Sequence, residues 1–502
     1  MVIGAAGKPA FRSALELRDG VRDGRWSAVE AVGAVLEQIR RANPRLEALN
    51  ELFHDEAVAQ ARVIDQKRSR GEPLGPLAGV PFTAKDNIAT REGHTTASSR
   101  ILAGYRAPYA ATVVERLQRA GAVLIGKTNM DEFGMGSSTE NSSVRVTRNP
   151  WRTTHVPGGS SGGAAALAAS VRGAFHLGSD TGGSIRQPAA CCGATGIKPT
   201  YGRVSRFGLL AFASSLDQIG PIASSARDCA LALGAMAGED PMDSTAARVP
   251  VPDYLAEIAK GVSGLRLGVV REYFPEGGVD PEVKSRVLEA VDVLRGLGVR
   301  VEEVSFPHAR YANPTYVLVS AAEASSNLAR YDGIHYGYRA ADAKGLVDLY
   351  SRSRADGFGP EVKRRIMVGT FVLSSGYYDA FYLKALKVRR LIRQDFEKAF
   401  EKFDAVIGPT SPVAAFPIGD RMDDPLKLYA VDVLTVSANL ASVPGISIPC
   451  GLTSDRLPVG LQIFARPFDD ATVLRFAHAF QEATTHHRLE PEVCGWKEAS
   501  GG

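Results

Sequence analysis

The chain has 502 residues, of which 45% are hydrophobic and 23% charged, proportions typical of a soluble globular protein with a sizeable core. Its 59 Lys and Arg against 55 Asp and Glu leave a net charge of +4, which is too small to indicate a nucleic-acid surface. Five scattered cysteines indicate a reduced compartment. No apolar run is long enough for a membrane span or a signal peptide, so we expect a cytoplasmic protein.

The first 70 residues carry two helical patterns. Ser27 and Glu30 form a predicted capping box, and apolar residues then recur at helical spacing until Asn43-Pro44 is expected to end the helix. A second helix is expected over residues 55–70. The short apolar segment LGPLAGVPFTAKDNI follows and carries Lys85 near its end.

The next pattern combines a helix with a strand. Thr112 and Glu115 form a second predicted capping box, and Gly121 is expected to end this helix. Residues 122–125 are predicted to form a short buried strand. Beyond a glycine-rich stretch, a helix of small residues is expected to begin at about Ser225.

From Gly264 onward, strands alternate with helices. Residues 265–270 and 299–304 are predicted strands, and between them a helix begins at Asp280-Pro281 and ends at Gly298. The later predicted elements are a helix containing Ile392, Phe396, Phe400 and Phe403, strands 405–407, 445–449 and 459–464, and a helix over 471–483.

This alternation predicts an α/β fold. We expect one large domain, whose mixed and mostly parallel sheet is covered by helices on both faces. Residues 1–70 are expected to pack on the core as a helical segment, residues 71–490 to form the main domain, and residues 491–502 to form a tail.

Residues 155–201 hold three glycine pairs, each beside a serine, which indicates backbone that comes close to a ligand. Several motif matches lack their required context. Residues 121–128 match the P-loop expression, but their apolar centre reads as a strand. The GxSxG matches at Ser160 and Ser161 have no strand leading into them. Asp180 begins a DTG sequence like that of aspartic proteases, but the chain lacks the second copy that their catalytic pair of carboxylates requires. No spacing of the histidines suits a metal site.

Two serines in glycine-rich surroundings, Ser160 and Ser184, remain as candidate nucleophiles. A serine hydroxyl needs a neighbouring base, and a lysine can serve when burial leaves its amine neutral. Lys85, directly after an apolar run, is the lysine best placed for burial. An ordinary surface lysine is the alternative that these residues alone leave open.

The combination of GGSSGG, DTGGSIRQPA and an upstream lysine resembles the amidase signature family over roughly residues 10 to 490. The resemblance implies the amidase signature fold and a Ser-cisSer-Lys catalytic set. Ser184 would be the nucleophile, Ser160 a bridging serine after a cis peptide bond, and Lys85 the base. The implied oxyanion hole consists of the backbone amides of Thr181, Gly182, Gly183 and Ser184.

Further stretches, among them TRNPW, KRRIMVGTFVLSSGYYDAFY and DPLKLYAVDVLT, resemble the branch of this family that serves tRNA-dependent amidotransferases. That branch implies glutamine as the substrate, held through its α-carboxylate by Arg365, or by its neighbour Arg364, and through its α-amino group by Asp432. The implied activity is a glutaminase that supplies ammonia for transamidation of Glu-tRNA(Gln), Asp-tRNA(Asn) or both.

The same resemblance implies two partners, which are a small C-type subunit together with a B-type kinase and tRNA-binding subunit. No cofactor or metal is expected on this chain, because ATP, Mg²⁺ and tRNA would be bound mainly through the partner. Two alternatives are a stand-alone amidase acting on another small amide and a non-catalytic scaffold subunit, which the presence of all three catalytic residues disfavours.

Overall fold

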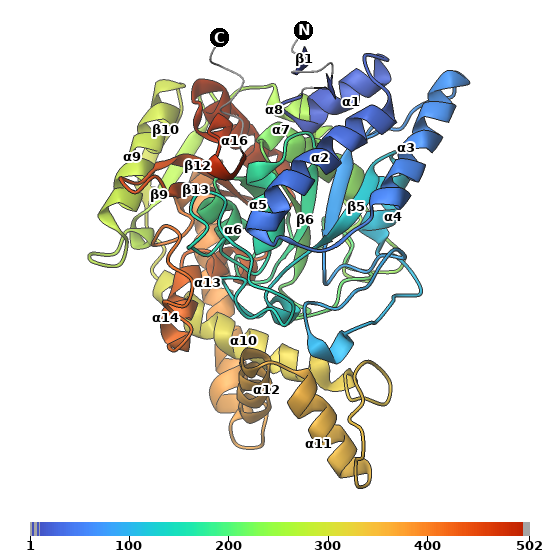
Figure 1. Cartoon of the computed structure of the whole chain (residues 1–502). Coiled ribbons are helices and arrows are strands. Elements are labelled where there is room, and N and C mark those ends of the chain that lie inside the picture. The colour runs from blue at the N-terminus through green and yellow to red at the C-terminus, as the bar shows by residue number, and fades with distance from the viewer. Residues whose placement is uncertain (1–2, 5–7, 10, 495–502) are drawn as a thin grey trace.

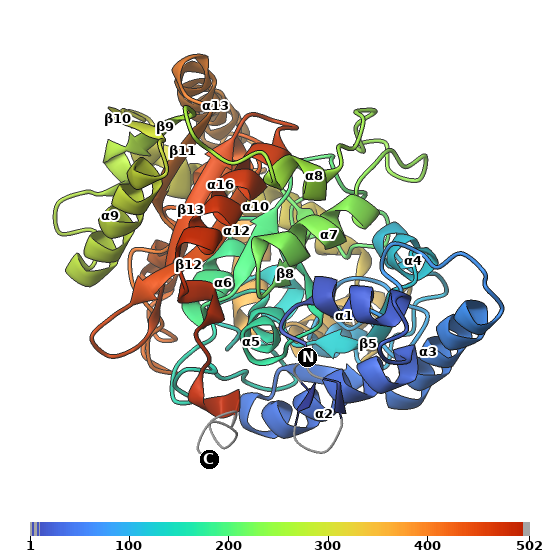
Figure 2. The same cartoon turned by 90° about the horizontal axis from the view of Figure 1, so that it is seen from above.

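A computed structural model describes residues 3–4, 8–9 and 11–494. Eleven strands form one sheet in the order β10-β9-β11-β13-β12-β7-β8-β6-β4-β5-β3. Seen from above, β10 with helix α9 lies at one end of the molecule, and β5 with helices α3 and α4 at the other (Figure 2). The strands of this sheet are β3 (Leu49–Leu52), β4 (Pro81–Lys85), β5 (Val123–Thr128), β6 (Phe175–Asp180), β7 (Thr195–Lys198), β8 (Gln218–Ala223), β9 (Arg266–Val270), β10 (Arg300–Val304), β11 (Ala405–Pro409), β12 (Gly445–Leu452) and β13 (Pro458–Ala465).

Helices cover both faces of this sheet (Figure 1). Successive side chains of β11 point to opposite faces of the sheet. Ala405 and Ile407 pack into one large hydrophobic cluster, and Val406 packs into another. The helices are α1 (Ala14–Arg22), α2 (Ala28–Leu46), α3 (His54–Ser69), α4 (Thr112–Arg119), α5 (Gly162–Ser170), α6 (Arg186–Cys192), α7 (Ala226–Met236), α8 (Tyr254–Ile258), α9 (Pro281–Gly296), α10 (Ala312–Asn327), α11 (Leu346–Gly357), α12 (Pro360–Val372), α13 (Lys384–Lys402), α14 (Pro425–Tyr429), α15 (Val436–Leu440) and α16 (Asp470–Ala483).

The predicted α/β class with a mixed sheet is confirmed. The expected predominance of parallel pairing does not hold, because only four of the ten strand pairings that the structure describes in this sheet are parallel. The β-α-β pattern after Gly264 does give parallel β9 and β10. Strands β12 and β13 pair antiparallel across residues 453–457, a connection too short for a helical crossover.

Two predicted helix boundaries were wrong. Helix α2 continues through Pro44 to Leu46, whose fully buried side chain stabilises the last turn, before Glu47 takes a left-handed conformation. Helix α4 begins at Thr112 itself, because the extended and buried Ala111 is its N-cap, so the predicted capping box is absent. The capping box at Ser27 is confirmed.

The N-terminal helices and the last described residues pack against the body of the fold. Strand β3 pairs with β5 at one edge of the large sheet, and side chains of α1, α2 and α3 enter the same core cluster. Strands β1 (Ile3–Gly4) and β2 (Lys8–Pro9) form a separate two-stranded sheet. Of the predicted tail 491–502, Val493 is buried, and residues 495–502 lie outside the described part of the chain. No helix among the described residues is long and apolar enough to cross a membrane.

Parallel pairing of β4 with β6 assembles the site. Phe82, Thr83 and Ala84 of β4 lie opposite Phe175, His176 and Leu177 of β6, so the carboxyl ends of the two strands are adjacent. Strand β4 ends at Lys85 and strand β6 at Asp180, directly before the glycine pair of DTGGS. Lys85 and the DTGGS turn, which lie about a hundred residues apart in sequence, therefore meet at the carboxyl ends of these two neighbouring strands.

Candidate active site

Lys85 is fully buried at the end of β4 and faces the glycine-rich stretch. Its Nζ lies 2.7 Å from Oγ of Ser160, 2.8 Å from Oγ of Ser161 and 3.2 Å from the carbonyl oxygen of Ser179. The Ser161 hydroxyl in turn donates to the Ser179 carbonyl at 3.2 Å. The alternative of a surface lysine is therefore wrong, and the lysine amine is surrounded by hydroxyl and carbonyl groups.

Burial lowers the pKa of Lys85 to about 7, although nearby Asp131, Asp180 and Asp217 act in the opposite direction. A lysine with this pKa is about half neutral near pH 7. In the neutral form, the two N–H groups of the amine would donate to Ser161 and Ser179, and its lone pair would face the Ser160 hydroxyl.

Ser160 lies in a loop whose backbone is held from two sides. The Gly159–Ser160 peptide bond is cis, as the family resemblance implies. The Gly159 amide donates to Oε1 of Gln187 at 2.9 Å, and the Asp131 amide donates to the Ser160 carbonyl at 3.2 Å. The amide of Ser161 donates to the carbonyl of Ser184 at 3.1 Å, which joins the two serine segments. The hydroxyls of Ser160 and Ser184 are not hydrogen-bonded to each other in the described chain.

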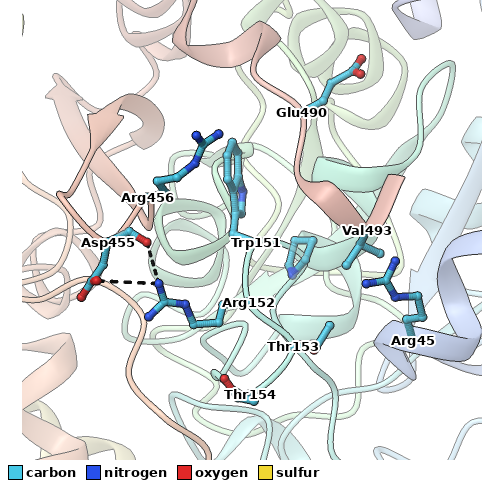
Figure 3. A pocket seen from close by; sticks show the side chains of 10 residues that line it. Arg45, Trp151, Arg152, Thr153, Thr154, Asp455, Arg456, Glu490 and Val493 are labelled. Atoms are coloured by element: carbon cyan, nitrogen blue, oxygen red, sulfur yellow. Dashed lines mark hydrogen bonds and ion pairs between the residues drawn. The ribbon is translucent and has the colours of Figure 1, made fainter. Parts of the chain in front are cut away.

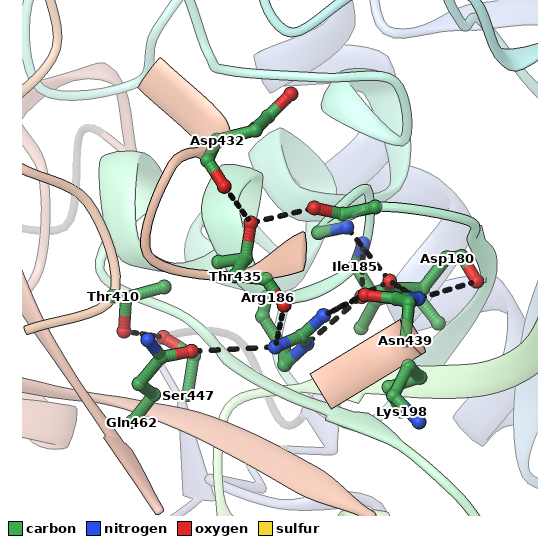
Figure 4. A network of polar contacts seen from close by, with 12 residues as sticks. Asp180, Ile185, Arg186, Lys198, Thr410, Asp432, Thr435, Asn439, Ser447 and Gln462 are labelled. Atoms are coloured by element: carbon green, nitrogen blue, oxygen red, sulfur yellow. Dashed lines mark hydrogen bonds and ion pairs between the residues drawn. The ribbon is translucent and has the colours of Figure 1, made fainter. Parts of the chain in front are cut away.

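The Ser184 segment is organised by a buried ion pair (Figure 4). The Asp180 carboxylate lies 3.1 Å from Nε of Arg186, and both side chains are fully buried. Burial works to raise the pKa of Asp180, but the Arg186 guanidinium outweighs it and lowers that pKa to about 2. The same carboxylate accepts from the amides of Gly183 and Ile185 at 2.8 and 3.2 Å, so it fixes the turn around Ser184. Arg186 also donates to Asn439, Thr435 and Gln462.

Both glycines before Ser184 are required by close neighbours. A Cβ on Gly182 would lie 2.5 Å from Cζ of Tyr316, and one on Gly183 would lie 2.2 Å from Oγ1 of Thr435. Gly183 also has φ of +136°, a conformation that side chains rarely adopt. Thr435 is itself 2.6 Å from the carbonyl oxygen of Gly182 and 2.9 Å from that of Asp432 (Figure 4).

The four amides that the resemblance assigns to an oxyanion hole are not equivalent. The amide of Gly183 donates to Asp180, so it is already engaged. The amides of Thr181, Gly182 and Ser184 have no acceptor among the described residues. Thr181 is oriented through its side chain, which donates to Asp217 at 2.6 Å. Three amides of this turn therefore remain available to an anion.

Of the two neighbouring arginines, Arg365 is the buried one. Its Nε donates to Oε1 of Glu361 at 2.7 Å and to the Tyr429 hydroxyl at 3.2 Å, whereas its Nη1 is buried without a hydrogen-bond partner. The Arg364 side chain is 44% exposed and also pairs with Glu361. A buried guanidinium nitrogen without an acceptor is costly, so this atom indicates a place for an anionic group.

Asp432 has a matching unpaired atom. Its Oδ2 accepts from the Ser137 hydroxyl, while its Oδ1 is shielded from solvent and has no partner. Burial raises the pKa of Asp432 to about 7, partly offset by the Ser137 hydrogen bond. Tyr316 lies close to both groups and to Gly182 and thus links them to the nucleophile segment.

Sequence reasoning missed several residues of this site. Ser161 was visible only as the second serine of GGSSGG, yet it is the second hydroxyl on Lys85. Asp180 stands out in the sequence only as the start of an isolated DTG motif, yet it is the ion-pair partner of Arg186. Asp131 lies in an unremarkable NMDEFG segment, and its contact with Ser160 has no sequence signal.

A separate cavity of about 290 Å³ contains none of these residues. Arg45, Trp151, Arg152, Asp455, Arg456 and Glu490 are among the residues that line it (Figure 3). Arg152 donates to the Asp455 carbonyl at 2.8 Å and lies 3.8 Å from its carboxylate. Both basic and acidic side chains line the cavity, so it does not present one sign of charge to a ligand. Among the described residues, no cluster of His, Cys, Asp and Glu could hold a metal ion.

The amidase family profile matches residues 30–474, and the chain belongs to the amidase family. The A subunit of glutamyl-tRNA(Gln) amidotransferase from Moorella thermoacetica is 56% identical over 483 residues, covering 96% of this chain and 99% of that protein.

Two solved structures give the same family and fold. The A subunit of glutamyl-tRNA(Gln) amidotransferase from Thermotoga maritima has a TM-score of 0.75 at 41% identity, covering 94% of this chain and 96% of that one. The peptide amidase from Stenotrophomonas maltophilia has a TM-score of 0.79 at 31% identity, with coverage of 94% and 96%.

Proposed function

We propose that the chain is the glutaminase subunit of a tRNA-dependent amidotransferase that forms Gln-tRNA(Gln) from Glu-tRNA(Gln). Near-complete alignment with the A subunits of glutamyl-tRNA(Gln) amidotransferases supports this function. The structural observation that carries it is the 2.7 Å contact between buried Lys85 and Ser160, close to the Ser184 turn. Transamidation of Asp-tRNA(Asn) would use the same ammonia and remains part of the proposal.

In the proposed mechanism, neutral Lys85 accepts the proton of the Ser160 hydroxyl, and Ser160 accepts the proton of Ser184. The Ser184 oxygen then attacks the side-chain carbonyl carbon of glutamine. This relay requires the Ser184 hydroxyl to turn toward Ser160 when substrate binds, and catalytic hydrogen bonds commonly tighten only in the substrate complex. Ser161 keeps the Lys85 lone pair directed at Ser160 by accepting a hydrogen bond from one of the amine's N–H groups.

The tetrahedral oxyanion would be stabilised by the free amides of Thr181, Gly182 and Ser184, with the Gly183 amide holding the turn through Asp180. Proton return through Ser160 to the departing nitrogen breaks the C–N bond and releases ammonia. The remaining γ-glutamyl ester on Ser184 is attacked by water, which yields glutamate and restores the serine hydroxyl.

Substrate selection is assigned to the two unpaired charged atoms. Nη1 of Arg365 would bind the α-carboxylate of glutamine, and Oδ1 of Asp432 would accept from its α-ammonium group. A substrate with both groups would satisfy two buried atoms at once. Arg364 serves this role poorly, because its side chain is 44% exposed, whereas Arg365 is buried and has an Nη1 atom without a partner.

We further propose that this chain acts as one unit with its N-terminal helices, in the cytoplasm, together with two other subunits, one B-type and one small C-type. The relatives are A subunits, which supports a complex of several chains. ATP, Mg²⁺ and most tRNA contacts would belong to the B-type subunit, and this chain would need no cofactor of its own for amide hydrolysis.

The second candidate is a stand-alone amidase, favoured by the similarity to a peptide amidase. The two functions differ in substrate and in dependence on partners. Ammonia release from glutamine should be measured for the chain alone and with the B-type and C-type subunits. We expect turnover with the partners to be lost in Ser184→Ala, whereas undiminished turnover would rule out the assignment.

A further inference from the structure

An exposed cluster of large apolar side chains covers one side of α12 and the turn that follows it. Met367 is 72% exposed, Phe371 49%, Tyr377 43%, Tyr378 40% and Phe381 37%. We call these five residues the aromatic patch. Tyr378 and Phe381 belong to the π-helix η6 (Tyr378–Leu383), in which no residue is buried. Contiguous exposed apolar surface of this kind marks interaction sites in soluble proteins.

The rings of the patch pack on one another rather than into the core. The Phe371 and Tyr377 centroids lie 4.3 Å apart, and the Tyr377 and Phe381 centroids 5.9 Å apart. The opposite side of α12 is closely packed, since a Cβ on Gly369 would lie 1.9 Å from the Ala321 carbonyl of α10. In Figure 1 these helices project from the end of the molecule farthest from the two termini.

We propose that the aromatic patch is the docking surface for another protein subunit of the amidotransferase. This inference rests on the proposed function, because the complex supplies the partner. Lys384 and Lys387, exposed on the first turn of α13, have no ion-pair partner among the described residues. The partner surface should therefore be apolar at its centre and acidic at its edge, since Phe, Tyr and Met are enriched in interface centres.

The position of the patch gives docking a functional consequence. Helix α12 carries Met367 and Phe371 of the aromatic patch on its exposed side and Arg365 on its buried side. A partner seated on Met367 and Phe371 would restrain the helix that we assign to substrate carboxylate binding. We expect partner binding to lower the KM for glutamine through this helix.

RNA is a less suitable occupant. Base stacking needs open aromatic faces, and here Phe371, Tyr377 and Phe381 are occupied by one another. A second copy of this chain would bring Lys384 and Lys387 of both copies into the same interface region, where like charges repel.

The experiment compares Phe371→Asp and Phe381→Asp with Leu288→Asp as a matched control. Leu288 is 40% exposed on α9, which lies apart from α12 in Figure 1. Purified chains would be titrated with the B-type and C-type subunits, and thermal unfolding would verify that each variant is folded. We expect the two patch variants to bind at least about tenfold more weakly, because buried aromatic residues dominate interface energy, and the control to bind normally.

Normal assembly of both folded patch variants would overturn the proposal. So would a concentration-dependent dimer of the isolated chain, or direct binding of tRNA, that is abolished by Phe381→Asp. Failure of the wild-type chain itself to assemble or to release ammonia would instead overturn the proposed function and this inference with it.

Discussion

Glu132 and Gly359 are joined across 227 positions of sequence by a 2.9 Å hydrogen bond from the Gly359 amide to Oε2 of Glu132. Gly359 is the N-cap residue of α12, which carries Arg365. Glu132 directly follows Asp131, whose amide donates to the Ser160 carbonyl. The adjacent residues Asp131 and Glu132 therefore contact both the loop that carries Ser160 and the helix assigned to substrate binding.

Glu132→Gln should impair glutamine binding more than chemistry. The amide side chain cannot accept from both Ser99 and Gly359, as the carboxylate does, and losing a hydrogen bond to a charged group costs about 1.5–3 kcal/mol. We expect the KM for glutamine to rise about tenfold or more, as that energy implies. Hydrolysis of a simple amide without an α-carboxylate serves as the control substrate. An equal loss with both substrates would mean that Glu132 has only a general structural role.

The pH dependence should follow the protonation of Lys85. Burial lowers its pKa to about 7, and only the neutral amine accepts a proton, so kcat/KM should rise with pH through 7 and then level off. Lys85→Arg keeps the positive charge but cannot deprotonate, and should lose about 10²–10⁴-fold in kcat. Asp432, whose pKa is also raised to about 7, contributes to the same limb through substrate binding. If kcat of Asp432→Asn no longer rose with pH near 7, that rise could not be assigned to Lys85.

Arg365→Lys should raise the KM for glutamine. Lysine retains a positive charge but loses the planar, bidentate geometry of the guanidinium, and we expect an increase of about 10- to 100-fold, or roughly 1.4–3 kcal/mol. Arg364→Lys is the matched control, because the adjacent side chain is 44% exposed and is not assigned to the pocket. Equal effects at the two positions in steady-state kinetics would remove the basis for choosing Arg365.

Gly182→Ala should displace the oxyanion-binding turn. Its new methyl group would lie 2.5 Å from the Tyr316 ring, so the backbone or the ring must move. Loss of one oxyanion donor typically costs about 10²–10³ in kcat, and we expect a decrease in that range. Gly33→Ala on α2, where nothing lies within 4 Å of the added group, is the control and should retain activity. Comparable kcat values for both variants would show that the turn tolerates displacement.

Sequence patterns predicted the elements that have strong local signals. The helix beginning at Asp280-Pro281 is confirmed as α9, because its capping residue and periodic valines all favour one state. Strands β6, β7 and β8 were not predicted, since they are fully buried and rich in glycine and polar residues, without alternation. Helix α10 was missed because its many small residues give little helical periodicity, and α11 and α12 were not predicted either.

The contacts of the site were harder to predict from local sequence patterns than the helices and strands. The apolar run before Lys85 indicated burial, but its contact with Ser160 spans 75 positions and depends on the parallel pairing of β4 with β6. The choice between Arg364 and Arg365 needed the orientation of α12. Asp180 and Arg186 are six residues apart, yet their role depends on Asn439, which reaches them from α15.

If Ser184 is the nucleophile, it forms a covalent γ-glutamyl ester during glutamine hydrolysis. Mixing the assembled complex with glutamine, quenching rapidly in acid and mapping the modified peptide by mass spectrometry would detect this ester. We expect a mass increase of one glutamyl group on Ser184 that is absent from Ser184→Ala and strongly reduced in Lys85→Arg. A glutamyl group on any other residue, or full ammonia release by Ser184→Ala, would show that Ser184 is not the nucleophile.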